Sequence, residues 1–291
     1  MFEGKRVAVV VPAYNEERLV VVTLGGIPEL VDRIYVVDDA STDGTSERAR
    51  GVGDSRVEVI RHERNKGVGG AIVTGYSRAL EEGIDVVCVM AADNQMDPAE
   101  LAELVGPVAR GEVEYAKANR LVSGEAWKVI PRTRYLGNAV LSLLTKIASG
   151  YWHVADSQAG YTALSASALR RLDLDRIYPR YGFPNDLLVH LNVQNARVRD
   201  IPSRPIYDVG ERSGIRLRSV IPRISWLLFK GFWWRMGHKY VIRDFHPLVF
   251  FYSFGVLMTL AGFVLGALEL VLRIAGNAIT TPTIVLVAVL L

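Results

Sequence analysis

Cysteine and histidine are scarce in this chain of 291 residues, and their scarcity excludes several kinds of site. The single cysteine, Cys88, has no second cysteine in the chain with which to form a disulfide. It stands in an apolar run at 84–90, which predicts a buried, small hydrophobic side chain. The five histidines include no pair spaced H-x-x-x-H, and this argues against a catalytic or structural zinc ion.

Net charge and a targeting segment are also lacking. The 34 Lys and Arg residues nearly balance the 31 Asp and Glu residues, so the net charge is +3 and gives no reason to expect binding to nucleic acid. The first residues, MFEGKRVAVVVPAYN, contain neither the hydrophobic core nor the cleavage site of a signal peptide. We therefore expect the N-terminal part of the chain to stay in the cytoplasm.

Half of the residues are apolar, and the excess lies near the C-terminus. The segment 248–268 contains no charged residue, and a helix of this length spans ~31 Å, the thickness of the bilayer core. We predict a transmembrane helix here. A second apolar run begins at Thr283 and continues to Leu291. It is either the first part of a second spanning helix, which we favour, or a short tail that packs on the first helix.

The segment 212–243, just before the predicted span, combines cations with aromatic residues. It contains eight Lys and Arg residues and no Asp or Glu, with Trp226, Phe229, Phe232, Trp233 and Trp234 among them. This composition is typical of helices that lie in the lipid headgroup layer. A solvated basic face over an aromatic core stripe is the alternative, and single-stranded nucleic acid is disfavoured by the adjacent span. The cations place the preceding domain on the cytoplasmic side.

The first hundred residues alternate between short apolar runs and helical patterns. We predict strands at 6–11, 33–37, 57–60 and 84–90, and helices at 16–25, 45–50, 68–82 and 98–110. This alternation is typical of a mostly parallel sheet that is covered by helices on both faces. Ligands of such sheets bind beyond the carboxyl ends of the strands, so the residues that follow each strand are the candidate site.

Each of these four strands is followed by a polar, acidic or glycine-rich cluster. The clusters are PAYNEE at 12–17, DDASTDGT at 38–45, RNKGVGG at 64–70 and AADNQMDP at 91–98. One cluster alone could be a helix cap, but four in succession favour a ligand site. The glycines fit neither G-x-G-x-x-G nor a P-loop, which disfavours a dinucleotide-binding dehydrogenase, although they can let a helix start approach a phosphate or ribose.

The carboxylates in these clusters suggest a nucleotide diphosphate bound through a metal ion. If the strand end is extended at Asp93, then Asp93 and Gln95 point to one side, and their oxygens suit Mg²⁺ or Mn²⁺. Asp38 and Asp39 at the neighbouring strand end can accept hydrogen bonds from a base or a ribose.

Residues 1 to about 210 resemble a family 2 glycosyltransferase with the GT-A fold, a Rossmann-like α/β sheet flanked by helices. The resemblance is to the branch of dolichyl-phosphate mannose synthases and other polyprenyl-phosphate glycosyltransferases. It is carried by the four clusters above and by KANR at 117–120, LTKIASGYW at 144–152 and DSQAGY at 156–161.

The resemblance implies roles for particular residues. The nucleotide would be bound by Pro12, Tyr14, Glu16, Asp38, Asp39, Lys66 and Gly67. Asp93 and Gln95 would bind the metal, and Asp93, Asp156 and Gln158 would be catalytic. The acceptor phosphate would be bound by Arg120, Arg132, Arg134 and Asn138, and the segment 181–186 would lie near the sugar. The chain departs from the family at Ala91, where an acidic residue is usual.

The predicted function is therefore inverting, metal-dependent transfer of a hexose from GDP-mannose or a UDP-sugar to polyprenyl or dolichyl phosphate. The enzyme would be a hexosyltransferase and an integral membrane protein that contacts membrane lipids, with its catalytic domain on the cytoplasmic face. We expect a catalytic domain at 1–210, interfacial helices at 211–246 and a transmembrane region at 247–291. The sugar, the nucleotide base and a homo-oligomeric state are left open.

Two alternatives differ in class from this function. A processive polysaccharide synthase would carry Q-x-x-R-W, but Gln194 and Arg197 are followed by Val198, and 197–201 is predicted to be an edge strand. A non-catalytic, membrane-anchored protein that binds a nucleotide sugar is supported by Ala91 alone.

Overall fold

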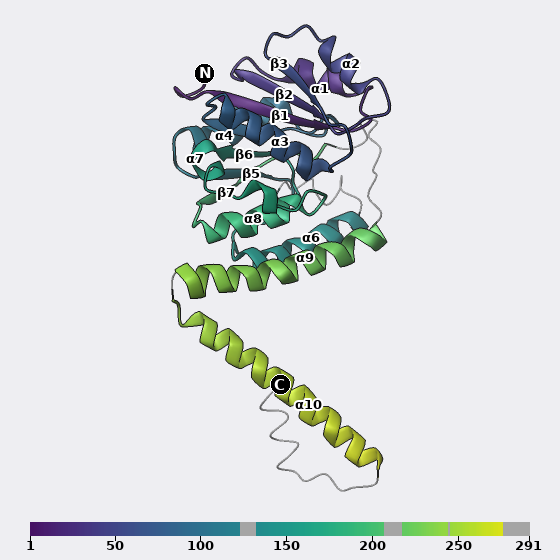
Figure 1. Ribbon diagram of the computed structural model, residues 1–291, viewed down its shortest axis with the longest axis vertical. Coiled ribbons are helices and arrows are strands. Elements are labelled where there is room, and N and C mark those ends of the chain that lie inside the picture. The colour runs from purple at the N-terminus through teal and green to yellow at the C-terminus, as the bar shows by residue number, and fades with distance from the viewer. Residues whose placement is uncertain (123–131, 207–216, 244, 276–291) are drawn as a thin grey trace. The chain divides into compact units, whose positions relative to one another are not determined.

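A computed structural model describes residues 1–122, 132–206, 217–243 and 245–275 of the chain (Figure 1). The chain divides into two compact units, Met1–Arg235 and Met236–Leu291, and each is described by itself. The division at 210 and 246 that we expect from the sequence stays a prediction. The predicted second span at 283–291 lies outside the described residues.

The first unit is built on a seven-stranded sheet with the order β3-β2-β1-β4-β6-β5-β7. Its strands are β1 (Val7–Ala13), β2 (Arg33–Asp38), β3 (Val57–Arg61), β4 (Val86–Val89), β5 (Tyr115–Asn119), β6 (Thr162–Ser165) and β7 (Val198–Pro202). Pairing is parallel except where β6 runs antiparallel to β4 and β5. The predicted α/β architecture is therefore confirmed, and β7 is the edge strand expected near Arg197.

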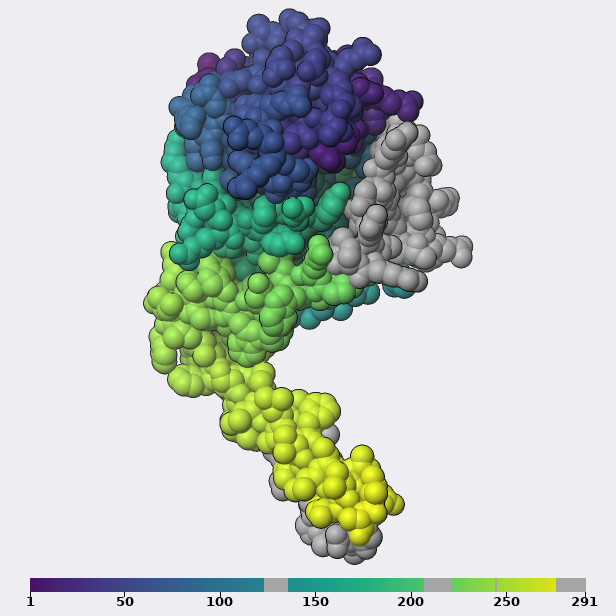
Figure 2. Space-filling view, turned by 45° about the vertical axis from the view of Figure 1, so that its right-hand side comes forward, coloured from purple at the N-terminus to yellow at the C-terminus, as the bar shows by residue number. Residues whose placement is uncertain are grey.

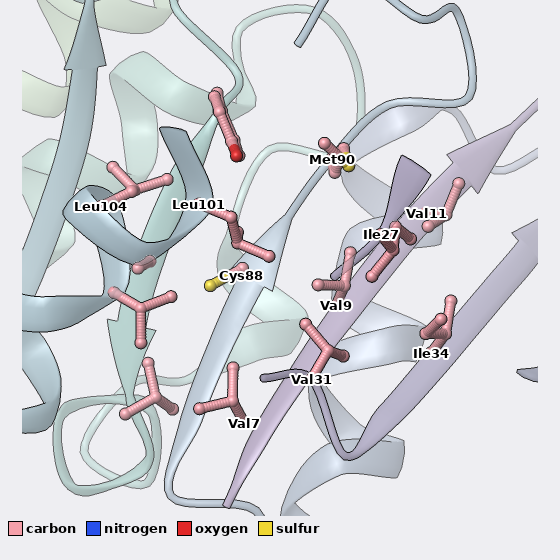
Figure 3. Packing of buried hydrophobic residues seen from close by; sticks show 14 of the residues in the cluster. Val7, Val9, Val11, Ile27, Val31, Ile34, Cys88, Met90, Leu101 and Leu104 are labelled. Atoms are coloured by element: carbon pink, nitrogen blue, oxygen red, sulfur yellow. The ribbon is translucent and has the colours of Figure 1, made fainter. Parts of the chain in front are cut away.

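The central strands are buried on both faces, which explains their continuous apolar sequences. In β1, Val7, Val9 and Val11 point to one side of the sheet, where Cys88 of β4 and Leu101 also lie (Figure 3). Ala8 and Val10 point to the opposite side, into a second core. Cys88 is buried, as its apolar surroundings predict.

Helices cover both faces of this sheet (Figure 1). On one face lie α1 (Val20–Gly26) and α4 (Leu101–Ala109), and on the other lie α3 (Val68–Glu81) and α8 (Phe183–Val193). The remaining elements of the unit are α2 (Thr45–Arg50), η1 (Pro98–Glu100), α6 (Arg132–Ser149), α7 (Ala166–Leu169), η2 (Leu174–Arg176) and α9 (Leu217–Gly237). Figure 2 shows the purple and blue N-terminal half gathered at one end of this unit, because the sheet order separates β1–β4 from β5–β7.

Two predicted boundaries are wrong for identifiable reasons. The helix expected from residue 16 begins only at Val20, because Asn15 has a φ of 57° and the amides of Glu16 and Glu17 donate to side chains of the next loop. The helix expected at 98–110 is divided into η1 and α4, and the Asp97 carboxylate caps its start by accepting from the Ala99 amide at 2.9 Å.

Helices α6 and α9 lie side by side in the first unit (Figure 1). Ala148 of α6, Val189 of α8 and Leu228 of α9 form a small core of their own. Arg235 is buried and donates from Nε to the carbonyl of Ala148 at 2.7 Å, so a cation from α9 caps the C-terminal end of α6.

The second unit contains a π-helical turn, His238–Arg243, and the helix α10, Leu248–Ile274. Helix α10 has 27 residues, extends past Glu269 and Arg273, and is the one helix among the described residues that is long and apolar enough to cross a membrane. The predicted helix at 248–268 is confirmed and is longer than expected.

We expect Gly75→Ala to destabilise the first unit. A Cβ at Gly75 of α3 would lie well inside van der Waals contact with both methyl groups of Val10, in the middle of β1. Overpacking of this kind lowers the free energy of unfolding by about 1–3 kcal/mol. The measurement is chemical denaturation of the detergent-solubilised protein. Gly137→Ala is the control: a Cβ there would meet no atom of the described residues within 4 Å outside its own stretch of helix, so it should be neutral or stabilise α6 by up to about 1 kcal/mol.

Candidate functional site

The candidate site is formed where β1, β2 and β4 end side by side. Ala13 is paired with Asp38, and the pairing continues as the Asp39 amide donates to the Ala13 carbonyl at 2.9 Å. On the other side of β1, the Ala92 amide donates to the carbonyl of Pro12 at 3.3 Å. The loops that begin at Tyr14, Asp39 and Ala91 therefore leave the same edge of the sheet, as the sequence predicts.

The loop after β1 is bound to the loop after β2. The Asn15 amide donates to Ser41 Oγ at 2.9 Å, and the Thr42 amide donates to Asn15 Oδ1 at 2.8 Å. The left-handed conformation of Asn15 makes this exchange possible and leaves the Tyr14 side chain 48% exposed. Pro12, which the resemblance assigns to the nucleotide, is buried within β1.

Asp38 is fully buried and accepts hydrogen bonds from its own loop. The Ser41 amide donates to Oδ1 at 2.8 Å, and the Ser46 hydroxyl donates to Oδ2. Burial opposes ionisation, but the hydrogen bonds from Ser41 and Ser46 outweigh it and lower the pKa of Asp38. The geometry gives Asp38 a part in shaping the loop, and its expected contact with a base or ribose stays a prediction.

Asp39 connects the β2 loop to the glycine-rich loop before α3. Its carboxylate accepts from the amides of Lys66 at 2.8 Å and Gly67 at 2.7 Å, and lies 2.7 Å from His62 Nδ1. His62 Nε2 lies 2.9 Å from Thr74 Oγ1, so the ring is fixed from both sides. Sequence reasoning missed His62, although its place directly after β3 was a usable signal.

The glycines before α3 allow close approach, but to the protein's own backbone. Gly67 has a φ of 89°, and a Cβ there would lie 2.5 Å from the Pro179 carbonyl oxygen. A Cβ at Gly69 would lie 2.7 Å from the Tyr178 carbonyl oxygen. These two glycines therefore allow the segment 178–180 to pack closely against the start of α3. A contact of Gly67 with a ligand stays a prediction.

A hollow of about 710 Å³ lies beside α3 and is lined by Lys66, Thr74, Arg78 and Asp175, among others. Its lining includes neither Asp39 nor Asp93. The candidate site is therefore defined by the three converging loops and not by this hollow. Lys66 belongs to both, because it lines the hollow and its amide donates to Asp39.

The segment after β4 forms a turn and is not extended. Asn94 has a φ of 56°, and the Gln95 amide donates to Asp93 Oδ1 at 3.1 Å. Contrary to the prediction from the sequence, Asp93 and Gln95 therefore do not share one side of an extended strand, but the turn keeps both residues together at the strand end. A carboxylate and an amide oxygen suit a hard cation, with oxygens of a bound diphosphate to complete its shell. The residues that the structure describes contain no cluster of three or more His, Cys, Asp or Glu suited to a metal.

Asp156 is fully buried and organises the loop that follows α6. Arg120 donates from Nε to Oδ2 at 2.8 Å and from Nη2 to Oδ1 at 3.2 Å, and Oδ1 also accepts from the amides of Gln158 and Ala159. Burial opposes ionisation of Asp156, but the guanidinium of Arg120 lowers its pKa. The structure thus brings two predicted site residues together as an ion pair, and their expected contacts with substrate stay predictions.

The buried face of α6 contains Ala148, which packs against α8 and α9, and two polar residues, Ser142 and Thr145, which contact this loop and α8. Asn185 of α8 donates from Nδ2 to Thr145 Oγ1 at 2.7 Å, and Ser142 Oγ lies 3.2 Å from Ser157 Oγ. Gln158 donates from Nε2 to Ser157 Oγ at 2.7 Å. The predicted phosphate ligands Arg132, Arg134 and Asn138 lie in the first two turns of α6, and the side chains of the two arginines lie outside the described residues.

The loop at 91–98, which contains Asp93 and is named the metal-side loop, contacts the loop at 155–161, which contains Asp156 and is named the acceptor-side loop. The Tyr161 hydroxyl donates to the Asp97 carbonyl at 3.0 Å, and a Cβ at Gly160 would lie 3.3 Å from Met96 Cε. Asp186, in the segment expected near the sugar, accepts from the Tyr178 amide at 2.8 Å, and burial raises its pKa.

Comparison with protein families gives a match to "Glycosyl transferase family 2" over residues 8–173. The chain is 31% identical over 218 residues to a UDP-N-acetylglucosamine–dolichyl-phosphate N-acetylglucosaminyltransferase from Methanococcus voltae, with 70% of this chain and 86% of that protein covered. It is 34% identical over 202 residues to an undecaprenyl-phosphate mannosyltransferase from Micrococcus luteus, with 68% and 82% covered.

Among solved structures, the fold is similar to glucosyl-3-phosphoglycerate synthase from Mycobacterium tuberculosis in complex with Mn²⁺, UDP and glucosyl-3-phosphoglycerate. The TM-score is 0.62 at 22% sequence identity, and the match covers 80% of this chain and 81% of that one. At this identity the similarity shows the fold alone.

We expect Arg120→Met to lower the free energy of unfolding by about 3 kcal/mol, because it leaves the buried Asp156 carboxylate without the guanidinium that pairs with it. The double variant Arg120→Met/Asp156→Asn should recover part of this loss. Since its pKa is lowered in the folded state, Asp156 contributes stability above its unfolded pKa of about 3.9 and loses it as the pH falls.

The measurement is denaturation at neutral pH and again below about pH 4, where the difference between wild type and Arg120→Met should shrink. Arg176→Met is the matched control, because its pair with Asp173 is exposed on both sides, and its effect should be close to zero. Equal losses in the two variants would show that Arg120 does not compensate Asp156.

Proposed function

The chain belongs to family 2 of the glycosyltransferases, and from this premise we propose that it transfers a sugar from a nucleotide diphosphate to a polyprenyl phosphate. The observation that carries the proposal is the contact between the metal-side loop and the acceptor-side loop, through Tyr161 and Asp97, where the end of β4 is paired with the start of β6. Two relatives whose names specify sugar transfer to a lipid phosphate support it.

Donor binding is proposed at the edge formed by the first two loops. Tyr14 is exposed there, Glu16 lies in the same loop, and Lys66 and Gly67 are held in place by Asp39. Asp93 and Gln95 would hold Mg²⁺ or Mn²⁺, which would neutralise charge on the diphosphate when bound. GDP-mannose, UDP-glucose and UDP-N-acetylglucosamine are the donors to compare.

The acceptor phosphate brings its own nucleophile. Its second pKa is about 6, so it is largely ionised near neutral pH and needs no strong general base. Its oxygen would form a bond to the anomeric carbon while the bond from that carbon to the diphosphate breaks, with inversion and release of the nucleoside diphosphate. The protein's task is to hold two anions together, and Arg132, Arg134 and Asn138 in the first turns of α6 are proposed to bind the acceptor phosphate.

The polarity of α6 and α9 supports contact with membrane lipids. Helix α6 exposes an apolar stripe, Leu136, Val140, Leu143 and Ile147, at helical spacing, while Ser142 and Thr145 on its other side are buried. Helix α9 exposes Trp226, Phe229 and Trp233 and buries Ile224 and Leu228. An apolar outer face on both helices is suited to the headgroup and acyl boundary. We propose that this unit lies on the cytoplasmic face and that α10 anchors it.

The test of the function is transfer of radiolabelled sugar from each donor to polyprenyl phosphate, with Mn²⁺, followed by extraction of the lipid product. One labelled sugar per lipid supports the proposal. A polymeric product would identify a processive synthase, for which Gln194 and Arg197 are the sole motif residues. Binding of the donor with no transfer would identify a non-catalytic protein, the alternative that Ala91 favours.

We expect Asp93→Ala to abolish transfer, because it removes the one carboxylate of the metal motif. Ala91→Asp should tighten the apparent affinity for Mn²⁺, since it restores a second carboxylate at the same strand end. Titration of transfer against Mn²⁺ measures both effects. Activity of Asp93→Ala that equals wild type at saturating Mn²⁺ would remove the metal assignment. An unchanged or weaker apparent affinity for Mn²⁺ in Ala91→Asp would show that another group already occupies that position.

We expect lipid contact at α9 to be visible by fluorescence. Brominated lipids quench tryptophan side chains that reach the bilayer, and Trp226 is 59% exposed. Trp226→Phe in reconstituted full-length protein should therefore reduce the quenched fraction. Trp234→Phe is the control, because Trp234 packs against His190 with 4.5 Å between ring centroids. Equal effects of the two substitutions would contradict the proposed membrane face.

A further inference from the structure

Lys117 is a buried cation in the interior of the sheet. It lies in β5, between β6 and β7, and its side chain is fully buried. The Nζ atom donates a hydrogen bond to the carbonyl of Ala159, in the acceptor-side loop. Burying an ammonium group costs free energy unless hydrogen bonds and opposite charges compensate it. The burial of Lys117 therefore needs an explanation beyond the packing of the sheet.

The end of β5 holds the acceptor-side loop at three points. Lys117 binds the Ala159 carbonyl, and Arg120 binds Asp156. Asn119 donates from Nδ2 to Asp200 Oδ2 at 2.8 Å, and that same oxygen accepts from the Ala155 amide at 2.7 Å. The loop is thus fixed at its start by Asp200, at Asp156 by Arg120, and at its far end by Lys117.

The far end of this loop is the part that touches the metal-side loop. Gly160, which follows Ala159, packs against Met96, and the Tyr161 hydroxyl donates to the Asp97 carbonyl. Displacement of the Ala159 carbonyl would therefore change the spacing between the two loops. A misplacement of about 1 Å between reacting groups can slow an enzyme about 100-fold.

We propose that Lys117 is a positioning residue for transfer, which sets the distance between the acceptor-side and metal-side loops through the Ala159 carbonyl. The proposal rests on the proposed function, because the loop at 156–160 contains Asp156 and Gln158, to which the resemblance gives a part in transfer. Lys117 itself touches neither donor nor acceptor, since its side chain is fully buried.

The charge of Lys117 predicts how the rate of transfer depends on pH. Burial lowers the pKa of Lys117 to about 8, against the attraction of Asp156 and Asp200, and Arg120 lowers it further. Burial raises the pKa of Asp200, which also faces His153, and its Oδ1 is buried without a hydrogen-bond partner among the described residues. As the pH rises through about 8, Lys117 loses its proton and no longer offsets these carboxylates, so transfer should fall on the alkaline side.

The experiment compares Lys117→Met, which removes the charge and the donor, with Lys117→Gln, which keeps a donor without charge. Lys5→Met is the matched control, because Lys5 is exposed and lies before β1. We expect Lys117→Met to lower kcat by about 10- to 100-fold with little change in the KM for the nucleotide sugar, and Lys117→Gln to recover part of the loss. Both variants should lack the alkaline decrease near pH 8 that the wild type shows.

Hydrogen exchange supplies a readout that needs no activity. The amides of Gln158 and Ala159 donate to Asp156 Oδ1 at 3.2 and 3.1 Å, and their protection should fall in Lys117→Met and stay unchanged in Lys5→Met. Unchanged protection in Lys117→Met would overturn the proposal whatever the transfer assay shows. If the wild type transfers no sugar while protection falls, the proposed function fails, and Lys117 holds the loop without a role in transfer. If circular dichroism shows that Lys117→Met does not fold, Lys117→Gln carries the comparison.

Discussion

The parallel pairing of β1 with β2 and β4 is the constraint on which the site depends. Because these strands run in one direction, their carboxyl ends reach a single edge of the sheet, and the loops that follow them converge. Residues that are 80 positions apart in the chain, such as Pro12 and Ala92, then become hydrogen-bond partners. The burial of both sheet faces holds this register, since a slip by one residue would move every side chain to the other core.

Most of the acidic residues at this edge bind protein groups. Asp38 holds its own loop, Asp39 holds the start of α3, and Asp156 holds the acceptor-side loop together with Arg120. Each buried carboxylate is compensated by backbone amides or by a cation, which is the condition for burying a charge at all. A site of this kind keeps exposed loops rigid enough to align two anionic substrates, which is the main demand of the proposed reaction.

In the proposed function, helix α6 joins the candidate site to the membrane-facing side of the first unit. Its buried side includes polar residues because it faces the network around Asn185 and Ser157, and its outer side is apolar. This distribution is the reverse of that on an ordinary surface helix. The Arg235 side chain of α9 caps α6 at the end opposite to Arg132, so α6, α9 and the proposed phosphate ligands form one connected element.

The sequence by itself determined the strands from β1 to β4, the parallel α/β class, the apolar helix α10 and the family, because each depends on local patterns of apolar residues or on short motifs. It also indicated where the loops of the site would lie. Tertiary structure alone decided what the loop residues do. Segments that the sheet brings together produce three features that local sequence does not show. These are the turn at Asn94, the contact between His62 and Asp39, and the close packing of the Tyr178 carbonyl against Gly69. The burial of Lys117 could not be foreseen for the same reason: a lysine in a short strand is normally exposed, and only the neighbouring strands and the loop at 156–160 supply the groups that compensate its charge.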